Sequence, residues 1–272
     1  MLCRGVFQTT KADGSPYYRA SITFQGKHIS LGSRPNEKKA HALYLEALAI
    51  VRGEKRLEDY PHNAALPFDK WVSLINFRDN QVYFRNPIYL HKSYFSYYLD
   101  QETELKFDKD DLFFYSEHRI QRRGKRLFCE NYGAQVSVMA RYGIHPFSVA
   151  GRDYQFMNGD SSDLRYSNIK VINRYMGVEK IQDGFQTLYR ATIHINGNWN
   201  LGLFDSEAKA AVAFNKALDH LSHNGREKTG IHSNYIDDLT AKEYADLYTA
   251  IRLPDRFLSH ISGEPNYSGL GQ

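Results

Sequence analysis

Three aspartates in the segment DYQFMNGDSSDLRYSNIK (153–170) are the side chains of this chain best suited to metal chemistry. Asp153, Asp160 and Asp163 offer hard oxygen ligands, and a Mg²⁺ ion bound by such ligands can activate water for hydrolysis. The same aspartates stand among asparagine, glycine and serine, a setting in which aspartate commonly caps turns through local hydrogen bonds. We favour turn capping and keep a magnesium site at these positions as the alternative.

A second group with clear chemistry is the basic run HRIQRRGKR, residues 118–126. The wider segment 116–152 carries seven Lys and Arg residues against two acidic ones. A cluster of this kind suits a polyanion, because each cation placed on a phosphate releases a counterion. A charged surface loop is the simpler interpretation, but the density of cations favours a clamp on a phosphate backbone. The predicted clamp residues are Arg119, Arg122, Arg123, Lys125 and Arg126, and Arg141, Arg152 and Arg165 are further candidates.

The remaining sequence carries no P-loop, no dinucleotide-binding fingerprint and no Ser-His-Asp arrangement. Its histidines lack the spacing of zinc ligands, and Cys3 and Cys129 are too few and too isolated for a disulfide framework. No apolar run is long enough to span a membrane, and the start MLCRGVFQTT has no secretory core. We therefore expect an intracellular protein with reduced cysteines, no metal, no cofactor and no membrane partner.

Two segments of the chain, 5–51 and 177–221, repeat one another. Both begin with Gly-Val, continue through Tyr-Arg-Ala-(Ser/Thr)-Ile and a glycine-led turn, reach Leu-Gly, and end in an alanine-rich stretch. Alternating apolar and polar residues predict three short strands in each copy, with hairpin turns at Gly26 and Gly197.

An amphipathic helix follows the strands in each copy. Apolar residues recur at helical spacing, first at Ala40, Leu43, Tyr44, Ala47, Leu48 and Val51, and then at Ala210, Ala213, Phe214, Ala217, Leu218 and Leu221. Asp205 is the predicted N-cap of the second helix, and Pro35 stands near the start of the first. Each helix is expected to cover one face of its sheet and to leave the other face open.

The open face of each sheet is predicted to carry arginine with small polar residues. Such a face fits the DNA major groove, because arginine forks onto guanine, asparagine onto adenine, and hydroxyl groups reach base edges or phosphates. An ordinary solvated sheet face is the alternative, and polar residues alone would favour that alternative.

The repeated pattern GV…YRAxI…G…LG…A resembles the APETALA/ethylene-response-factor DNA-binding domain over about 45 residues in each copy. The resemblance implies that outward side chains of three strands read the major groove. Mapped onto this sequence, the reading positions are Arg19, Ser21, Thr23, His28 and Ser30 in the first copy, and Arg190, Thr192, His194, Asn198 and Asn200 in the second. The family often places tryptophan on these strands, whereas Ser30 and Asn200 stand here at one such position, so we expect a different base preference.

The segment between the copies resembles the HNH homing-endonuclease core, and the order of HNH core followed by APETALA-type module is that of phage homing endonucleases. Its retained scaffold is Asn158-Gly159-Asp160, Asp163, Arg165 and Asn168. The resemblance places a metal ligand at position 155 and a general base at position 156, where this chain has Gln155 and Phe156. An amide is a poor ligand for a hard cation, and phenylalanine cannot accept a proton. Ala140 and Leu164 replace further polar residues of the pattern. These departures predict that the core does not cut.

Together these observations predict an α+β protein in which two three-stranded-sheet-plus-helix modules flank a degenerate HNH (ββα-metal-like) core. The expected boundaries are 1–77, 78–175 and 176–252, with a flexible tail over 253–272.

The expected function is sequence-specific binding of double-stranded DNA at a long or bipartite site, without enzymatic activity. The expected role is transcriptional repression by occlusion of a promoter. The protein is expected in the cytoplasm, associated with DNA, of a bacterium that is infected by a phage or carries a mobile element. The alternatives are a working magnesium-dependent nuclease or nickase and, from another class, a protein-binding scaffold.

Overall fold

The computed structural model describes residues 2–146, 148–226 and 230–263, which fall into two compact units. One unit comprises residues 1–138 and 156–169, and the other comprises residues 139–155 and 170–272. The described residues contain six α-helices and five small sheets, so the predicted α+β class is confirmed. Within them, no helix is both long and apolar enough to cross a membrane.

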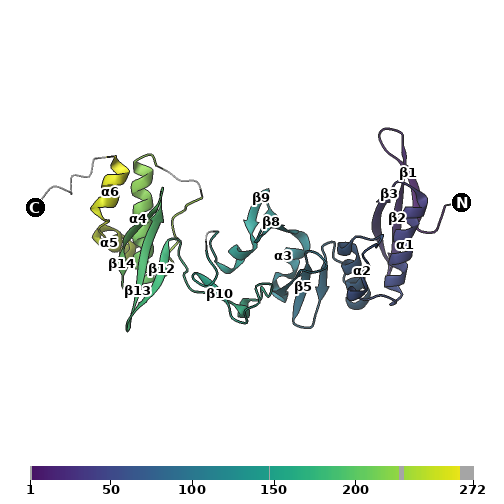
Figure 1. Cartoon of the computed structure of the whole chain (residues 1–272), viewed down its shortest axis with the longest axis horizontal. Coiled ribbons are helices and arrows are strands. Elements are labelled where there is room, and N and C mark those ends of the chain that lie inside the picture. The colour runs from purple at the N-terminus through teal and green to yellow at the C-terminus, as the bar shows by residue number, and fades with distance from the viewer. Residues whose placement is uncertain (1, 147, 227–229, 264–272) are drawn as a thin grey trace, which may run out of the picture. The chain divides into compact units, whose positions relative to one another are not determined.

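The first unit begins with a three-stranded antiparallel sheet and the helix that packs on it (Figure 1). Its elements are β1 Val6–Thr10, β2 Pro16–Phe24, β3 Lys27–Arg34, α1 Glu37–Val51, η1 Leu57–Asp59 and α2 Phe68–Asn80. The predicted stripe of α1 is confirmed in its main members, since Ala40, Leu43, Tyr44 and Ala47 are buried. Helix α2 adds Trp71 and Leu74 to the same core, and it runs across the predicted boundary at residue 77.

The middle of the sequence forms two further small sheets with short helical turns. The elements are β4 Ile88–Leu90, β5 Tyr94–Tyr98, β6 Glu104–Asp108, η2 Lys109–Asp111, α3 Leu112–Glu117, β7 Ile120–Arg123, β8 Arg126–Asn131, β9 Ala134–Ser137 and η3 Val138–Tyr142. Phe95, Phe107 and Tyr115 pack as a buried aromatic cluster beneath the β4–β6 sheet, with the Phe107 and Tyr115 ring centroids 4.3 Å apart. Residues 107–115 end β6 and continue through η2 into α3, and β8 and β9 form a hairpin that leads into η3.

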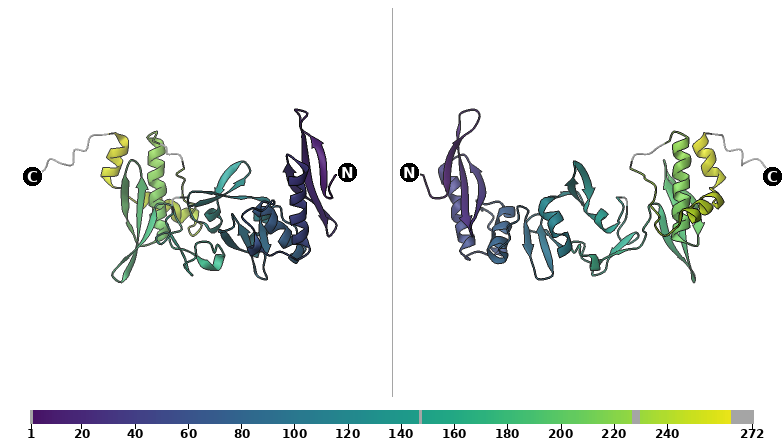
Figure 2. Two further views of the ribbon diagram at one scale, coloured as in Figure 1. Left: turned by 45° about the vertical axis from the view of Figure 1, so that its right-hand side comes forward. Right: turned by 180° about the vertical axis from the view of Figure 1, so that it is seen from behind.

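The second unit repeats the sheet and helix of the first and adds two helices. Before this sheet in the sequence come the short elements β10 Tyr154–Phe156, η4 Tyr166–Asn168 and β11 Ile169–Val171, of which η4 belongs to the first unit. The sheet and helices of the second unit are β12 Val178–Asp183, β13 Gln186–His194, β14 Asn198–Phe204, α4 Glu207–His223, α5 Ala241–Ala250 and α6 Asp255–Ser262. Figure 2 shows α1 and α4 each running along one side of its own sheet.

The two modules share their irregularities as well as their regular elements. In both sheets the register shifts at the same place, between Ala20 and Ser21 and between Ala191 and Thr192. In each module the chain enters the first strand through a glycine in the left-handed region, Gly5 or Gly177, that lies directly against an aromatic ring of the covering helix. Because the bulges and the glycine–aromatic contacts occur at corresponding positions, the two modules have the same local structure.

Two predictions for the C-terminal part of the chain are wrong. Ser206, and not Asp205, is the N-cap of α4, because its hydroxyl accepts from the Lys209 amide at 3.2 Å, whereas Asp205 pairs with the Lys209 ammonium. The predicted flexible tail contains the helix α6, which buries Phe257 and Ile261 in the core of the unit. Apolar burial by these two side chains orders this part of the chain, while residues 264–272 of the predicted tail lie outside the described residues.

Buried asparagines fix many of the loops. The Asn215 side chain holds the backbone of Asn234, since it donates to the Asn234 carbonyl at 2.9 Å and accepts from the Asn234 amide at 2.7 Å. Asn234 in turn holds the backbone of Met176 through both its amide and its carbonyl. Asn76, Asn168 and Asn173 also bind loop backbone from buried positions, and the buried Asn86 side chain donates to the backbone of α3.

Candidate nucleic-acid interface

The open face of the β1–β3 sheet carries four of the five side chains predicted to read bases. Arg19, Thr23, His28 and Ser30 are exposed, and Thr23 lies across from His28 with 3.4 Å between their side-chain polar atoms. Ser21 is only 8% exposed, so its expected access to solvent is wrong. The chain entering β1 runs beside Ser21, whose amide donates to the Gly5 carbonyl at 3.0 Å, and the β2–β3 register shifts at this position.

Arg19 is held in place by Tyr17, a residue outside the predicted set of reading residues. Its guanidinium donates to the Tyr17 hydroxyl at 2.8 Å and lies over the Tyr17 ring, 5.5 Å from the ring centroid. Tyr17 and Arg19 are two residues apart on one strand, so both side chains stand on the same face. This spacing in the sequence is the feature from which the contact could have been predicted. The contact restrains a long side chain without neutralising its charge.

The open face of the β12–β14 sheet carries the second set of predicted residues. His194, Asn198 and Asn200 are exposed, while Arg190 and Thr192 are half-buried. The His194 ring nitrogen and the side-chain Oδ1 of Asn198 are 2.8 Å apart, and the side chain of Asn200 accepts from the Gly202 amide at 3.0 Å. These contacts orient polar side chains outward.

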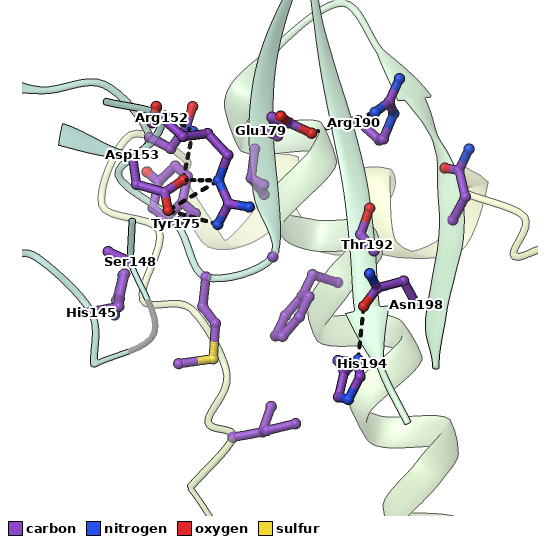
Figure 3. Close-up of a pocket in the computed structure, with 17 residues that line it drawn as sticks. His145, Ser148, Arg152, Asp153, Tyr175, Glu179, Arg190, Thr192, His194 and Asn198 are labelled. Carbon is purple, nitrogen blue, oxygen red and sulfur yellow. Dashed lines mark hydrogen bonds and ion pairs between the residues drawn. The ribbon is translucent and has the colours of Figure 1, made fainter. Parts of the chain in front are cut away.

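A cleft of about 720 Å³ lies over this second face (Figure 3). All five predicted residues of the second module line it, together with Glu179, which pairs with Arg190 at 3.4 Å. Figure 3 shows Glu179, Arg190 and Thr192 on neighbouring strands, and Arg152 and Asp153 across the opening from them.

The far wall of the cleft is fixed by Asp153. Its carboxylate accepts from the Arg152 guanidinium at 2.8 Å, from Asn173 at 2.8 Å and from the Val149 amide at 2.7 Å. Burial alone would raise the pKa of Asp153, but the hydrogen bonds from these partners outweigh burial and lower the pKa. Asp153 therefore stays ionised and presents Arg152, whose side chain is half exposed, at the edge of the cleft.

The predicted phosphate clamp lies on the β7–β8 hairpin. Residues 121–126 are all exposed, and Gly124 adopts φ +59 at the turn between the paired residues Arg123 and Arg126. Arg122 forms an ion pair with Asp100 at 3.0 Å, and Arg119 lies 3.7 Å from Asp69. The hairpin thus gathers Arg122, Arg123, Lys125 and Arg126 on one solvent-facing projection, and Arg119 precedes its first strand.

The aspartates considered as magnesium ligands are engaged in local structure. Asp160 accepts from the Ser162 amide and hydroxyl, and these hydrogen bonds lower its pKa. Asp163 is buried and accepts from Arg165 and Asn158, and the hydrogen bond from Arg165 is the main cause of its lowered pKa. Turn capping is confirmed at Asp160. Asp163 links Asn158 and Arg165, which lie on either side of it in the same loop.

The structure also gives the surroundings of the residues predicted to belong to a degenerate HNH core. Leu164 is buried. Asn168 is also buried, and its side-chain amide donates to the backbone carbonyls of Asp160 and Asp163. Gln155 and Phe156 lie half-buried in β10, and Ala140 is exposed in η3. Among the described residues, no group of three or more His, Cys, Asp or Glu side chains is arranged to hold a metal ion.

Comparison with known proteins adds no relative: no family model, curated protein or solved structure matches this chain.

Proposed function

We propose that this protein binds double-stranded DNA sequence-specifically through the open faces of the β1–β3 and β12–β14 sheets. The observation that carries the proposal is the duplication. The same sheet, bulge and covering helix occur twice, and each copy directs an arginine and a histidine away from its helix, beside hydroxyl or amide side chains. These are the groups that pair with base edges and phosphates in a major groove.

The β7–β8 hairpin supplies the sequence-independent part of binding. Its exposed Arg122, Arg123, Lys125 and Arg126 suit phosphate oxygens, which fix a protein on the duplex without reading its sequence. Two reading modules in one chain also raise affinity through their effective concentration, provided that both reach the same duplex. The target is accordingly a long or bipartite site.

The protein binds without cutting. Gln155 and Phe156 replace the ligand and the base that the resembling endonucleases use, and Asp153, Asp160 and Asp163 already bind neighbouring groups of the chain. A non-cutting protein with a long site is suited to occluding a promoter. We assign it the role of a repressor that associates with DNA in a bacterium carrying a phage or mobile element.

The experiment that tests this function is genome-wide capture of DNA by the tagged full-length protein, followed by incubation of the recovered sites with protein and Mg²⁺. A sharp peak over a promoter, with the DNA intact, is the expected result. A nick or break within the peak would overturn the non-cutting assignment. Absence of any peak, with weak and salt-insensitive binding in solution, would overturn DNA recognition itself, because phosphate-driven binding must fall with salt.

A further inference from the structure

The two modules differ at one pair of positions that their shared fold makes directly comparable. Phe7 on β1 lies across from Arg19 on β2, and Glu179 on β12 lies across from Arg190 on β13. In each sheet the arginine is the residue before the alanine of the bulge. The arginine is therefore constant, while its cross-strand neighbour changes from an aromatic ring to a carboxylate.

In the first module the surroundings of the arginine are aromatic. Phe7 is 57% exposed, which leaves a large apolar side chain without cover on the open face. The Tyr17 ring lies beneath the Arg19 guanidinium on the same strand. A surface ring beside an arginine can bury itself against the 5-methyl group of thymine, since that methyl group is the apolar feature of the major groove.

In the second module the arginine shares its face with an acid. Arg190 donates to Glu179 at 3.4 Å, and both side chains remain about 40% exposed, at 42% and 39%. A carboxylate on a surface that faces DNA is repelled by phosphates and by the acceptor atoms of guanine and thymine. The donor it meets best in the major groove is the N4 amino group of cytosine.

We propose that Phe7 and Glu179 determine specificity, so that the two modules read different bases beside a shared guanine contact. This inference rests on the proposed DNA-binding function. Arg19 with Phe7 selects guanine next to thymine, whereas Arg190 with Glu179 selects a guanine and a cytosine. Because Glu179 also fixes the Arg190 guanidinium, the pair acts as one reading unit. The target is then bipartite with unequal halves, although the modules themselves are repeats.

The test is selection of bound sequences from a random duplex pool by the full-length protein and by two variants. Glu179→Gln keeps the shape of the side chain but removes the charge, and it converts an acceptor for cytosine into a group that pairs with adenine. Phe7→Ala removes the ring alone. The matched controls are Glu130→Gln and Phe113→Ala, which alter an exposed glutamate on β8 and a ring on α3 that is 78% exposed.

The parent should select a site with two dissimilar halves. Glu179→Gln should lose its preference for cytosine in one half by roughly tenfold, with adenine gaining, and leave the other half unchanged. Phe7→Ala should lose the thymine preference only in the opposite half. The controls should select the parental site.

Two results would overturn the inference while leaving DNA recognition intact: a parental site made of two identical halves, or the parental site selected unchanged by both variants. If the parent enriches no sequence at all, the proposed function fails first, and genome-wide capture without a peak would record that failure separately.

Discussion

Replacement of Gly177 by alanine tests the close packing that defines both modules. Gly177 has φ +73, a conformation that side chains with a Cβ rarely adopt, and it lies at the entry to β12. A Cβ built there would come within 2.5 Å of the Thr192 carbonyl oxygen and would overlap the Phe214 ring. Neither obstacle yields easily, since one is backbone in the sheet and the other is a ring buried in the core.

The magnitude follows from two separable contributions. The left-handed backbone costs alanine about 1–2 kcal/mol. Forcing a methyl group into a filled space adds about 1–3 kcal/mol. Gly177→Ala should therefore lower the free energy of unfolding of the second unit by about 2–5 kcal/mol. Gly184, in the β12–β13 turn, has φ +58 but nothing within 4 Å of a built Cβ, so Gly184→Ala should show only the smaller backbone contribution.

Hydrogen exchange measured by mass spectrometry localises the effect. Amides of α4 should lose protection in Gly177→Ala by the larger amount and in Gly184→Ala by the smaller, and α1 in the first unit should be unchanged in both variants. Equal losses of protection in the two variants would refute the reasoning, because the close approach to Phe214 and Thr192 would then contribute nothing.

Three further outcomes are expected. Arg19→Ala should lose about 1–3 kcal/mol of discrimination between target and random DNA, as fluorescence anisotropy with the two duplexes would record, and unchanged discrimination would exclude the first sheet as a reader. Replacing Arg122 and Arg123 by glutamine should weaken binding to all duplexes alike and reduce the slope of log K against log salt by about 0.9 for each phosphate that is no longer neutralised, whereas weakening confined to the target would contradict a backbone role. The hydrogen bond from Arg165 lowers the pKa of Asp163 in the folded state. The ionised Asp163 carboxylate therefore stabilises the fold above about pH 4, the ordinary pKa of aspartate, and this stabilisation is lost as the pH falls through the lowered pKa of the folded state. Asp163→Asn should consequently destabilise the first unit at pH 7 by about 1.5–3 kcal/mol in denaturant titrations, and a difference from the parent that fails to shrink at low pH would contradict this account.

Periodicity predicted the modules because each element has one buried face. The alternation around Ile22 and Ile193, and the helical spacing from Ala40 and Ala210, follow directly from the 2.0- and 3.6-residue periods. These local patterns identify strands and helices before any contact is known.

Features that depend on irregular or distant contacts were not predictable in the same way. Ser21 is buried at a bulge, which shifts the register of the strands without leaving a mark in composition. Helix α6 forms because Phe257 meets a core assembled from residues far away in sequence, while its neighbourhood is rich in turn-forming residues. The predicted division into three modules remains a prediction. So do DNA binding and the assignment of each reading residue.

The buried asparagines have a consequence for how this gene tolerates mutation. Codons for asparagine and aspartate differ by one transition, and the resulting side chains are nearly identical in size. At Asn215 or Asn234 that change would remove an amide donor and place a carboxylate against backbone carbonyl oxygens in the interior. Sequence variation should thus be purged at Asn215, on α4, and at Asn234, in the loop that Asn215 holds, more strongly than at many apolar positions, where one aliphatic group substitutes for another. Loops usually accumulate differences fastest, and in this protein several of them should be among the slowest to change.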